Sequence, residues 1–345
     1  MSHFKQTVVL ALSGGVDSAV AAHLLKRQGC HVIGLFLKHP YQREDETDAL
    51  KNATFLDIPL EILDVSEPFE TVVESFTDDY FSGRTPNPCV RCNRTVKFGV
   101  LFDYAMEKLG ADHYATGHYV RSGKVDGFPA LFRGVDDTKD QAYVLYGIDR
   151  SKLDRLLFPL GELMKTDVRR IAEEIGLPVL DKKESQDICF VADGCHSEFL
   201  HARRPGVDTS GNFVDTDGNF LALHGGFERF TIGQRKGMGI GFGKRIFVLK
   251  LDAETRDVVI GPWEKLARQR LTAKEVRWLL SEDPAEPIRC GVKIRYRSKT
   301  AAATMIPIPN GVDVEFDEPQ YGIAPGQSAV FYHDDRLLGG GVIME

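Results

Sequence analysis

The chain has 345 residues, of which 43% are hydrophobic and 27% charged, as in a globular protein large enough for two or three domains. Its start lacks a signal-peptide pattern, and no apolar run approaches the roughly 18 residues of a membrane span, so we expect a cytoplasmic protein without membrane contact. Six cysteines in so long a chain exclude a disulfide scaffold and indicate free, metal-bound or catalytic thiols.

The formal net charge of −7 is unevenly distributed. Residues 229–299 contain 17 Lys and Arg against 8 Asp and Glu. A basic zone on an acidic chain predicts either a surface for a polyanion such as nucleic acid or a set of solvated side chains, and the counts favour neither.

The first half of the chain alternates short apolar runs with helical patterns. Strands are predicted at 7–12, 31–37, 60–65 and 113–119, and helices at 18–29, before residue 56, at 67–81 and at 96–111. This alternation predicts an α/β fold with a doubly wound parallel sheet in residues 1–204. Ligands of such sheets bind at the carboxyl ends of the strands.

From about residue 205 the pattern changes to glycine-rich turns and short β-type segments. Residues 291–300 alternate apolar with basic side chains, which predicts a half-buried strand with a basic outer face. Residues 329–344 predict a closing hairpin. We therefore expect a small β-rich central domain at 205–268 and a C-terminal β-barrel at 269–345.

The string SGGVDS, residues 13–18, follows the first predicted strand. Gly14 and Gly15 allow close backbone approach to an anion, and Ser13 and Ser18 add hydroxyl donors. Asp17 is expected either to cap the next helix or to hold a magnesium ion. The lysine of the Walker loop is absent, so a cradle for released pyrophosphate, with attack at the α-phosphorus, fits better than γ-phosphoryl transfer. The alternative is an ordinary glycine-rich turn.

Four cysteines lie in two polar segments. Cys89 and Cys92 form a C-x-x-C pair in TPNPCVRC, and Cys189 lies in ESQDICFV with Cys195 nearby. Four thiols could bind zinc, but the gap between Cys189 and Cys195 exceeds the usual spacing, and the prolines favour a rigid loop that presents single side chains. On spacing alone, metal binding and thiol chemistry both stay open.

The glycine loop resembles the pyrophosphate loop of the ATP pyrophosphatase (PP-loop) superfamily. With the strings that follow it in order, the chain is similar to bacterial tRNA-specific 2-thiouridylases over nearly its whole length; these strings are GRTPNPCVRCNRTVKFG, ATGHY, KDQAYVLYGI, ESQDICFV, FTIGQRKGMGIG, IRYRSK and PGQSAVFY. The resemblance implies ATP- and Mg²⁺-dependent 2-thiolation of the wobble uridine of tRNA, through an adenylated base and a cysteine persulfide, with release of AMP and pyrophosphate. It also implies a barrel that binds tRNA, and a persulfide relay protein or cysteine desulfurase as partner.

The resemblance assigns roles to individual residues. Cys189 would carry the persulfide, and Cys92 would attack it or help to transfer its sulfur, leaving a disulfide between the two. ATP would contact Ala11, Leu12, Ser13, Gly14, Gly15, Val16, Asp17, Ser18, Leu37 and Gly117. The target base and the tRNA would contact Asn87, Pro88, Cys89, His118, Lys139, Asp140, Gln141, Arg295, Tyr296 and Gln327. No resident metal site is expected.

The sequence departs from the family pattern at two places. Many members have Asp where this chain has Cys89, so this thiol is expected to be a wall of the base pocket or an alternative disulfide partner of Cys92. The segment after Lys38 is also shorter than usual. Two other functions remain as alternatives: an adenylating ligase or amidotransferase acting on a small metabolite, and a zinc-stabilised RNA-binding module.

Overall fold

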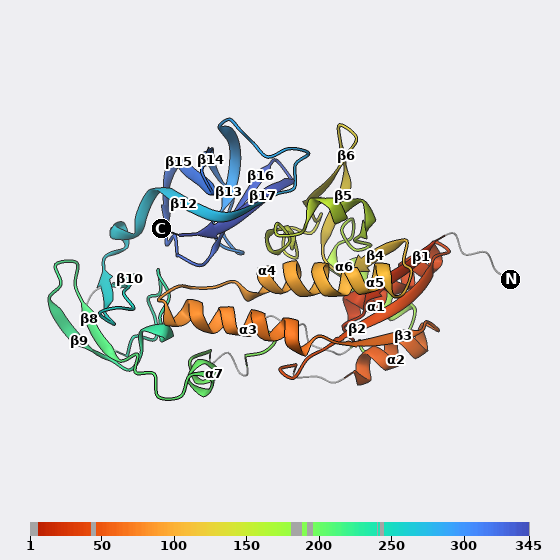
Figure 1. The fold of residues 1–345 in the computed structure, drawn as a ribbon, viewed down its shortest axis with the longest axis horizontal. Helices are drawn as coiled ribbons and strands as arrows, with labels where there is room; N and C mark the ends of the chain where they lie inside the picture. Colours follow the sequence, from red (N-terminus) through yellow and green to blue (C-terminus); the bar gives the residue numbers. More distant parts are fainter. Residues whose placement is uncertain are drawn as a thin grey trace.

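The structure is a computed structural model that describes residues 6–42, 46–180, 188–191, 196–239, 241 and 245–344 (Figure 1). Its helices are α1 (Val16–Arg27), α2 (Thr47–Phe55), α3 (Ser66–Phe81), α4 (Pro88–Cys92), η1 (Asn93–Leu101), α5 (Phe102–Glu107), η2 (Ala142–Val144), η3 (Arg150–Arg155), α6 (Lys165–Glu174), α7 (His196–Arg203), η5 (Phe227–Arg229) and η6 (Trp263–Leu266). Its strands are β1 (Thr7–Ala11), β2 (His31–Lys38), β3 (Leu60–Asp64), β4 (His113–Thr116), β5 (Val120–Val125), β6 (Phe128–Arg133), β7 (Leu156–Leu157), β8 (Gly211–Val214), β9 (Phe220–His224), β10 (Phe247–Leu251), β11 (Val258–Gly261), β12 (Ala267–Trp278), β13 (Ile288–Lys293), β14 (Ala301–Ile308), β15 (Gly311–Tyr321), β16 (Ser328–His333) and β17 (Arg336–Ile343).

A parallel sheet with strand order β3-β2-β1-β4-β7 forms the N-terminal part, so the predicted doubly wound α/β class is confirmed. Successive residues of β1 face opposite layers. Val8 and Leu10 pack in the core cluster with α1 and α6, whereas Val9 packs in the cluster with α3 and the α4–α5 region. Burial on both faces explains why the strand is a continuous apolar run.

Helix α3 and the helices α4, η1 and α5 extend together from this sheet towards the central β-strands (Figure 1). The helix predicted at 67–81 is confirmed as α3. The helix predicted at 96–111 begins earlier, at Pro88, and passes through the π-helix η1. The prolines before Cys89 predicted a loop. Proline is also favoured in the first turn of a helix, because its missing N–H costs no hydrogen bond there.

Two further sheets contain the remaining strands. The central sheet has strand order β10-β11-β8-β9. The strands β12-β15-β14-β13-β16-β17 form a barrel, which the β12–β17 pairing closes, and the predicted hairpin at 329–344 is confirmed as β16–β17. The hairpin β5–β6 from the N-terminal part joins this barrel through β6–β17, which the sequence did not reveal. The domain limits 204/205 and 268/269 stay predictions.

The prediction of a long basic strand at 291–300 is wrong beyond Lys293, where β13 ends. Lys293 is buried and its ammonium lies 5.9 Å and 6.0 Å from the ring centres of Tyr143 and Tyr296. The chain then turns, with Ser298 N donating to Arg295 O at 3.1 Å. The alternation of apolar and basic residues does not show where a strand ends and a turn begins. Among the described residues, no helix has the length and apolar character to cross a membrane.

Candidate nucleotide and thiol site

The loop after β1 has the geometry of an anion cradle. Gly14 adopts φ +78°, and a Cβ there would lie 3.0 Å from Ala49 N, so only glycine fits between the loop and α2. Helix α1 begins after Gly15, which has no side chain to cap the first N–H groups. Ser18 Oγ accepts from Ser13 N at 3.2 Å and donates to Gly15 O at 3.1 Å, which closes the loop. The N–H groups at the start of α1 can therefore bind phosphate oxygens.

Asp17 does not cap α1, because it pairs with two residues distant in sequence. Lys165 Nζ contacts its two carboxylate oxygens at 2.6 Å and 2.8 Å, and Tyr119 donates to Oδ1 at 2.8 Å. Lys165 opens α6, and its backbone N–H donates to Asp136 Oδ2 at 2.9 Å. The loop lacks a lysine of its own, but the fold brings one to it, and our sequence analysis missed this residue.

The other expected nucleotide contacts surround the same loop. Ala11 and Leu37 lie at the carboxyl ends of β1 and β2, and Gly117 follows β4. A Cβ at Gly117 would lie 3.0 Å from Ser18 N, so the backbone after β4 passes directly against the start of α1. The strand ends thus converge where the sequence predicted a ligand. Leu12 is buried beneath the loop, and Val16 and Asp17 are half-buried.

Cys89 and Cys92 lie on the short helix α4. Residues just before them in the sequence and a residue of the distant barrel hold this helix in position. Asn87 caps it by accepting from Val90 N at 3.4 Å, and Pro88 is buried at its first turn. Gln327, which precedes β16, donates to Thr85 O at 2.9 Å and to Pro86 O at 3.3 Å. The barrel therefore holds the proline loop that presents the two thiols.

The two thiols differ in exposure and acidity. Cys89 is exposed and Cys92 half-buried. Burial raises the pKa of Cys92 to about 12, while the ammonium of Lys97 lowers it and the nearby Cys189 and Cys89 raise it further. The protein around Cys89 also raises the pKa of that thiol, again opposed by Lys97. Lys97 is thus a cation shared by both thiols, and no pattern in the sequence singles it out.

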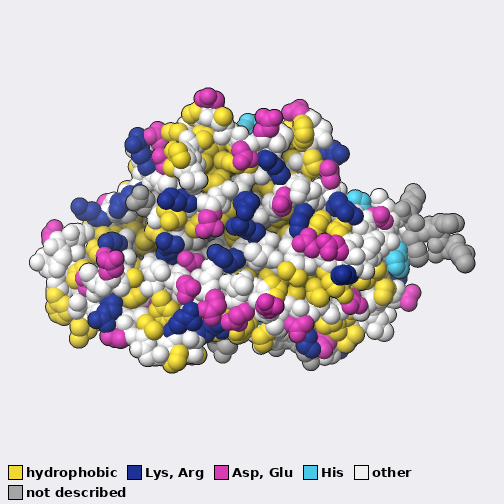
Figure 2. Space-filling view, in the orientation of Figure 1, with side chains coloured by type: hydrophobic (Ala, Val, Ile, Leu, Met, Phe, Trp, Pro, Cys, Tyr) yellow, Lys and Arg dark blue, Asp and Glu magenta, His cyan; other side chains and the backbone are white. Residues whose placement is uncertain are grey.

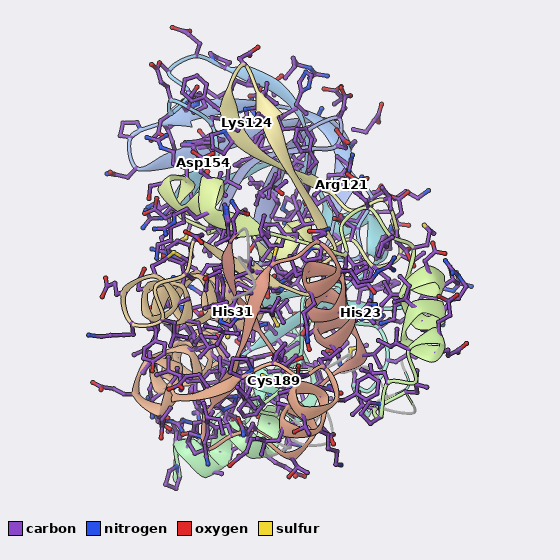
Figure 3. All side chains as sticks on the ribbon, turned by 90° about the vertical axis from the view of Figure 1, so that its right-hand side faces the viewer. His23, His31, Arg121, Lys124, Asp154 and Cys189 are labelled. Carbon is purple, nitrogen blue, oxygen red and sulfur yellow. The ribbon has the colours of Figure 1, made fainter. Side chains whose placement is uncertain are left out.

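Cys189 is exposed, next to a residue anchored in the core. Phe190 is 6% exposed, and its ring centre lies 5.1 Å from Phe76 and 5.8 Å from Phe69, both of α3. Phe69 also stacks on His39 at 3.7 Å, just beyond β2. Phe190 therefore connects Cys189 to the strand end at the nucleotide cradle. In Figure 3, Cys189 lies well below Arg121 and Lys124 of the β5–β6 hairpin.

Helix α7 closes this aromatic cluster. Phe199 lies 5.5 Å from Phe190, and the Arg203 guanidinium pairs with Glu70 and Glu74 of α3. Only a small part of the Arg203 side chain is exposed. The salt bridges fix α7 against α3 and hold the wall behind Cys189.

Several expected RNA contacts use their polar groups inside the protein. Asp140 accepts from Gly134 N and Ala142 N at 3.1 Å, and Gln141 accepts from Tyr119 N at 2.9 Å. Arg295 Nη2 donates to Ile232 O at 2.7 Å, which links the barrel to the central domain. In this structure, the side chains of these three residues therefore hold loops in position.

The remaining expected RNA contacts lie near the thiols or between the domains. His118 is buried, hydrogen-bonded to Thr116 at 2.8 Å, and burial holds its pKa well below the usual value, so it is neutral. Tyr296 is 39% exposed and donates to Asp140 O at 3.1 Å. Burial and the charge of Asp140 raise the pKa of its phenol, and the nearby Cys89 thiol adds to that rise. Lys139 is half-buried on the loop before Asp140.

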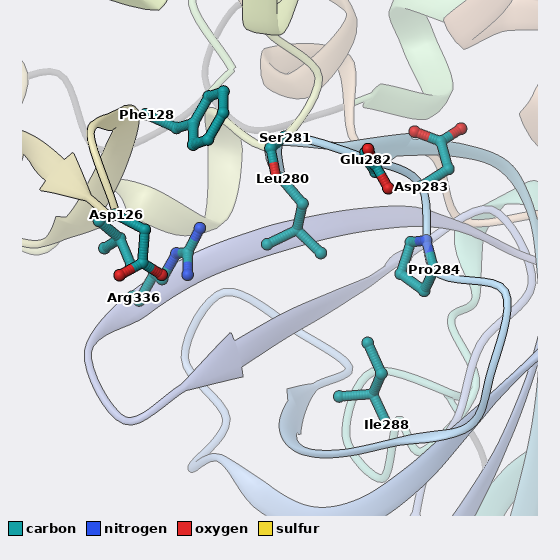
Figure 4. Close-up of a pocket in the computed structure, with 10 residues that line it drawn as sticks. Asp126, Phe128, Leu280, Ser281, Glu282, Asp283, Pro284, Ile288 and Arg336 are labelled. Carbon is teal, nitrogen blue, oxygen red and sulfur yellow. The ribbon is translucent and has the colours of Figure 1, made fainter.

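The described residues bring together no group of three His, Cys, Asp or Glu side chains suited to a metal ion. Cys195, part of the zinc alternative, lies outside the described residues. A cavity of about 360 Å³ lies between the β5–β6 hairpin and the loop after β12 (Figure 4), and its lining includes Phe128, Leu280 and Arg336. None of the expected site residues lines it.

Comparison with known proteins matches three family models to successive parts of the chain. Residues 6–193 match a family model described as tRNA methyl transferase HUP domain, 197–262 its PRC-barrel domain, and 268–343 an aminomethyltransferase beta-barrel domain. A protein of Syntrophotalea carbinolica named tRNA-specific 2-thiouridylase MnmA is 43% identical, over 99% of this chain and 100% of that protein. The chain belongs to the tRNA-specific 2-thiouridylase family.

A second relative agrees over the full length. The tRNA-specific 2-thiouridylase MnmA of Rhodopirellula baltica is 42% identical, over 97% of this chain and 96% of that protein. Among solved structures, a 4-thiouridine synthetase in complex with RNA and ATP matches with a TM-score of 0.37 and 21% identity, covering 58% of this chain and 50% of that one.

Proposed function

We propose that the protein is a tRNA-uridine 2-sulfurtransferase that uses ATP to replace the C2 oxygen of the wobble uridine by sulfur. The observation that supports this most directly is that Cys89 and Cys92 share the short helix α4 and that Cys189 lies near enough to raise the pKa of Cys92, within a domain whose strand ends converge on an anion cradle. A ligase or amidotransferase acting on a small metabolite would need no such thiols and no barrel attached to the thiol loop.

The first step activates the base. The uridine O2 attacks the α-phosphorus of ATP, the bond to the bridging oxygen breaks, and pyrophosphate leaves. The α1 N–H groups and the Ser13 and Ser18 hydroxyls would hold the departing phosphates. Lys165 would supply the positive charge that the loop lacks. Asp17 would hold Mg²⁺ only if its contact with the Lys165 ammonium were broken. Mg²⁺ would neutralise phosphate charge.

The second step delivers sulfur. A persulfide on Cys189 is attacked at its Cys189 sulfur by the Cys92 thiolate, which forms a Cys92–Cys189 disulfide and releases hydrosulfide. Hydrosulfide adds to C2, and AMP leaves with the former uridine oxygen. The sulfane sulfur gains the two electrons that the cysteines lose, so each turnover needs a thiol reductant and a new persulfide from a relay protein or cysteine desulfurase.

The surroundings of Cys92 favour its protonated thiol, so the thiolate would form only at the step that delivers sulfur. Its half-buried thiol has a raised pKa, with Lys97 as the compensating cation. Cys89 stands where the uridine would enter, and Tyr296 adjoins it from the barrel. In this arrangement Cys89 serves as a wall of the base pocket and as a second possible partner for Cys92.

The test is nucleoside mass spectrometry of tRNA after incubation with ATP, Mg²⁺ and a persulfide donor. Wild-type protein should form 2-thiouridine at the wobble position, and Cys189→Ser should form none while it still binds ATP. The matched control is Cys290→Ser in the barrel core, away from the site, which should retain thiolation. Full thiolation by Cys189→Ser would contradict the assigned role, and zinc loss on Cys92 replacement without pyrophosphate release would favour the RNA-binding module.

A further inference from the structure

Two arginines of the helical segment that carries the thiols and one arginine of the barrel lie close enough for their charges to interact. Arg91 belongs to α4, Arg94 to η1, and Arg277 to β12 of the barrel. The stem of Arg94 packs on Gly147, where an added Cβ would lie 3.3 Å from Arg94 Cβ. Figure 2 shows Lys and Arg side chains along the middle of this face, between the barrel above and the helices below.

One carboxylate reaches into this cluster from a distorted strand. Glu275 Oε2 lies 3.7 Å from Arg94 Nη1. Glu275 adopts φ +50°, in a region that side chains other than glycine rarely enter, and it occupies the bulge where β12 shifts register against β17 between Lys274 and Arg277. The bulge places Glu275 against the helix and leaves Arg277 on the strand beside it.

The cluster carries more positive than negative charge. The other carboxylate nearby, Asp79, lies 3.7 Å from Arg84. Within the described part of the chain, neither Arg91 nor Arg277 forms a salt bridge. Burial and the charges of Arg277 and Arg91 lower the pKa of Arg94, with Glu275 opposing them. Like charges held this close weaken the fold, and an anion bound between them would relieve the repulsion.

We propose that Arg91, Arg94 and Arg277 bind backbone phosphate of the RNA that flanks the target uridine, with Glu275 holding Arg94 until phosphate replaces it. This rests on the proposed function. Arg91 lies between Cys89 and Cys92 in the same helix, so a uridine held at the thiols brings its neighbouring phosphates over this turn. The planar guanidinium matches phosphate in two-point hydrogen bonding, and phosphate contacts fix the register of a nucleic acid.

The experiment measures binding of unmodified tRNA as a function of salt concentration, with thermal unfolding of each variant alone. Arg277→Gln should weaken binding several-fold and reduce the slope of log K against log salt by about 1, because one phosphate contact is lost. Its unfolding midpoint should be equal to or above that of wild type, since a repulsive charge is removed. Glu275→Gln should do the reverse: tighter tRNA binding and a lower unfolding midpoint.

The matched control is Arg289→Gln. Arg289 is an exposed arginine of β13 in the same barrel, paired with Asp317 through two contacts of 2.7 Å, so its removal should leave the salt slope unchanged. Wild-type affinity and slope in Arg277→Gln, or weaker binding by Glu275→Gln, would overturn the proposal. Thiolation by the wild-type protein, measured in parallel, separates the two claims. If the wild type thiolates tRNA and Arg277→Gln binds tRNA as the wild type does, only the phosphate site is refuted. If the wild type does not thiolate tRNA, the function is refuted and the salt slopes alone decide the phosphate site.

Discussion

At the scale of single residues, burial keeps the thiol of Cys92 protonated to a higher pH than an ordinary thiol. Its pKa is raised to about 12, so the thiolate fraction should rise about tenfold for each pH unit between 7 and 9. The alkylation rate of Cys92 by iodoacetamide, followed by peptide mass spectrometry, should rise accordingly. Lys97→Gln should lower that rate, because the compensating cation is gone. A rate independent of pH in this range would contradict the assignment.

The same shift bears on stability. The folded-state pKa of Cys92 lies above the ordinary value of 9.0, so the protonated thiol stabilises the fold fully below that pH. The contribution is lost as the pH rises towards 12. Cys92→Ala should therefore flatten the decline of unfolding free energy with pH on the alkaline side.

Lys165 provides a second prediction at this scale. Lys165→Ala removes the ammonium that contacts Asp17 at 2.6 Å, and loss of one charge-assisted hydrogen bond to phosphate is worth about 10- to 100-fold in affinity. We expect ATP and pyrophosphate to bind more weakly by that factor, with AMP binding nearly unchanged, in calorimetric titrations. Lys165→Arg should restore part of the affinity. Equal loss for AMP would indicate a damaged fold.

How much of the site was predictable varied by residue. The loop Ser13–Ser18 has a local signature, because consecutive glycines and hydroxyls build the cradle within one turn. Lys165 and Lys97 reach the site through the fold: Lys165 is far from Asp17 in sequence, and lysines are common on helices that carry no site. No local pattern could have selected them.

At the scale of elements, the anchor behind Cys189 determines where the persulfide is held. Phe190→Ala removes three aromatic contacts and retains both cysteines in the chain. We expect slower formation of the Cys92–Cys189 disulfide under mild oxidation and lower thiolation, with ATP affinity within twofold of wild type. Phe190→Leu, which keeps an apolar anchor, should be intermediate. Normal disulfide formation by Phe190→Ala would show that the anchor is dispensable.

Elements were predictable where periodicity decides the structure. The strand ends and α3 follow from apolar runs and a regular helical pattern. The helix at Pro88 and the end of β13 at Lys293 were missed, because proline is compatible with both a loop and a helix start, and Lys293 is buried against tyrosines from distant segments. Tertiary contacts override local pattern at both places.

At the scale of the whole molecule, Arg295 joins the barrel to the central domain. Its guanidinium donates to Ile232 O at 2.7 Å and to Gly322 O at 2.5 Å. Arg295→Ala would leave two carbonyls without their donor, at about 1–3 kcal/mol each if they stay buried. We expect calorimetry of Arg295→Ala to resolve two unfolding transitions, more than the wild type shows. We also expect this variant to bind tRNA more weakly. An unchanged calorimetric trace would contradict this linking role.

The joining of β6 to β17 could not be foreseen for a related reason. Pairing of a hairpin near residue 130 with a strand near residue 337 depends on long-range topology, which no local pattern encodes. The sequence indicated a basic zone. In the structure, Arg295 of this zone joins the barrel to the central domain, whereas Arg277 lies in the arginine cluster at the thiol helix.

The central claim is that one site activates the uridine oxygen with ATP and replaces it by cysteine-borne sulfur. The most direct measurement follows the oxygen: tRNA carrying ¹⁸O at the C2 position of the wobble uridine, with ATP and a persulfide donor, analysed by mass spectrometry of the nucleotides. The account predicts one ¹⁸O in AMP for each 2-thiouridine formed, and none in pyrophosphate. Thiouridine formed with unlabelled AMP, or with the label in water, would contradict it.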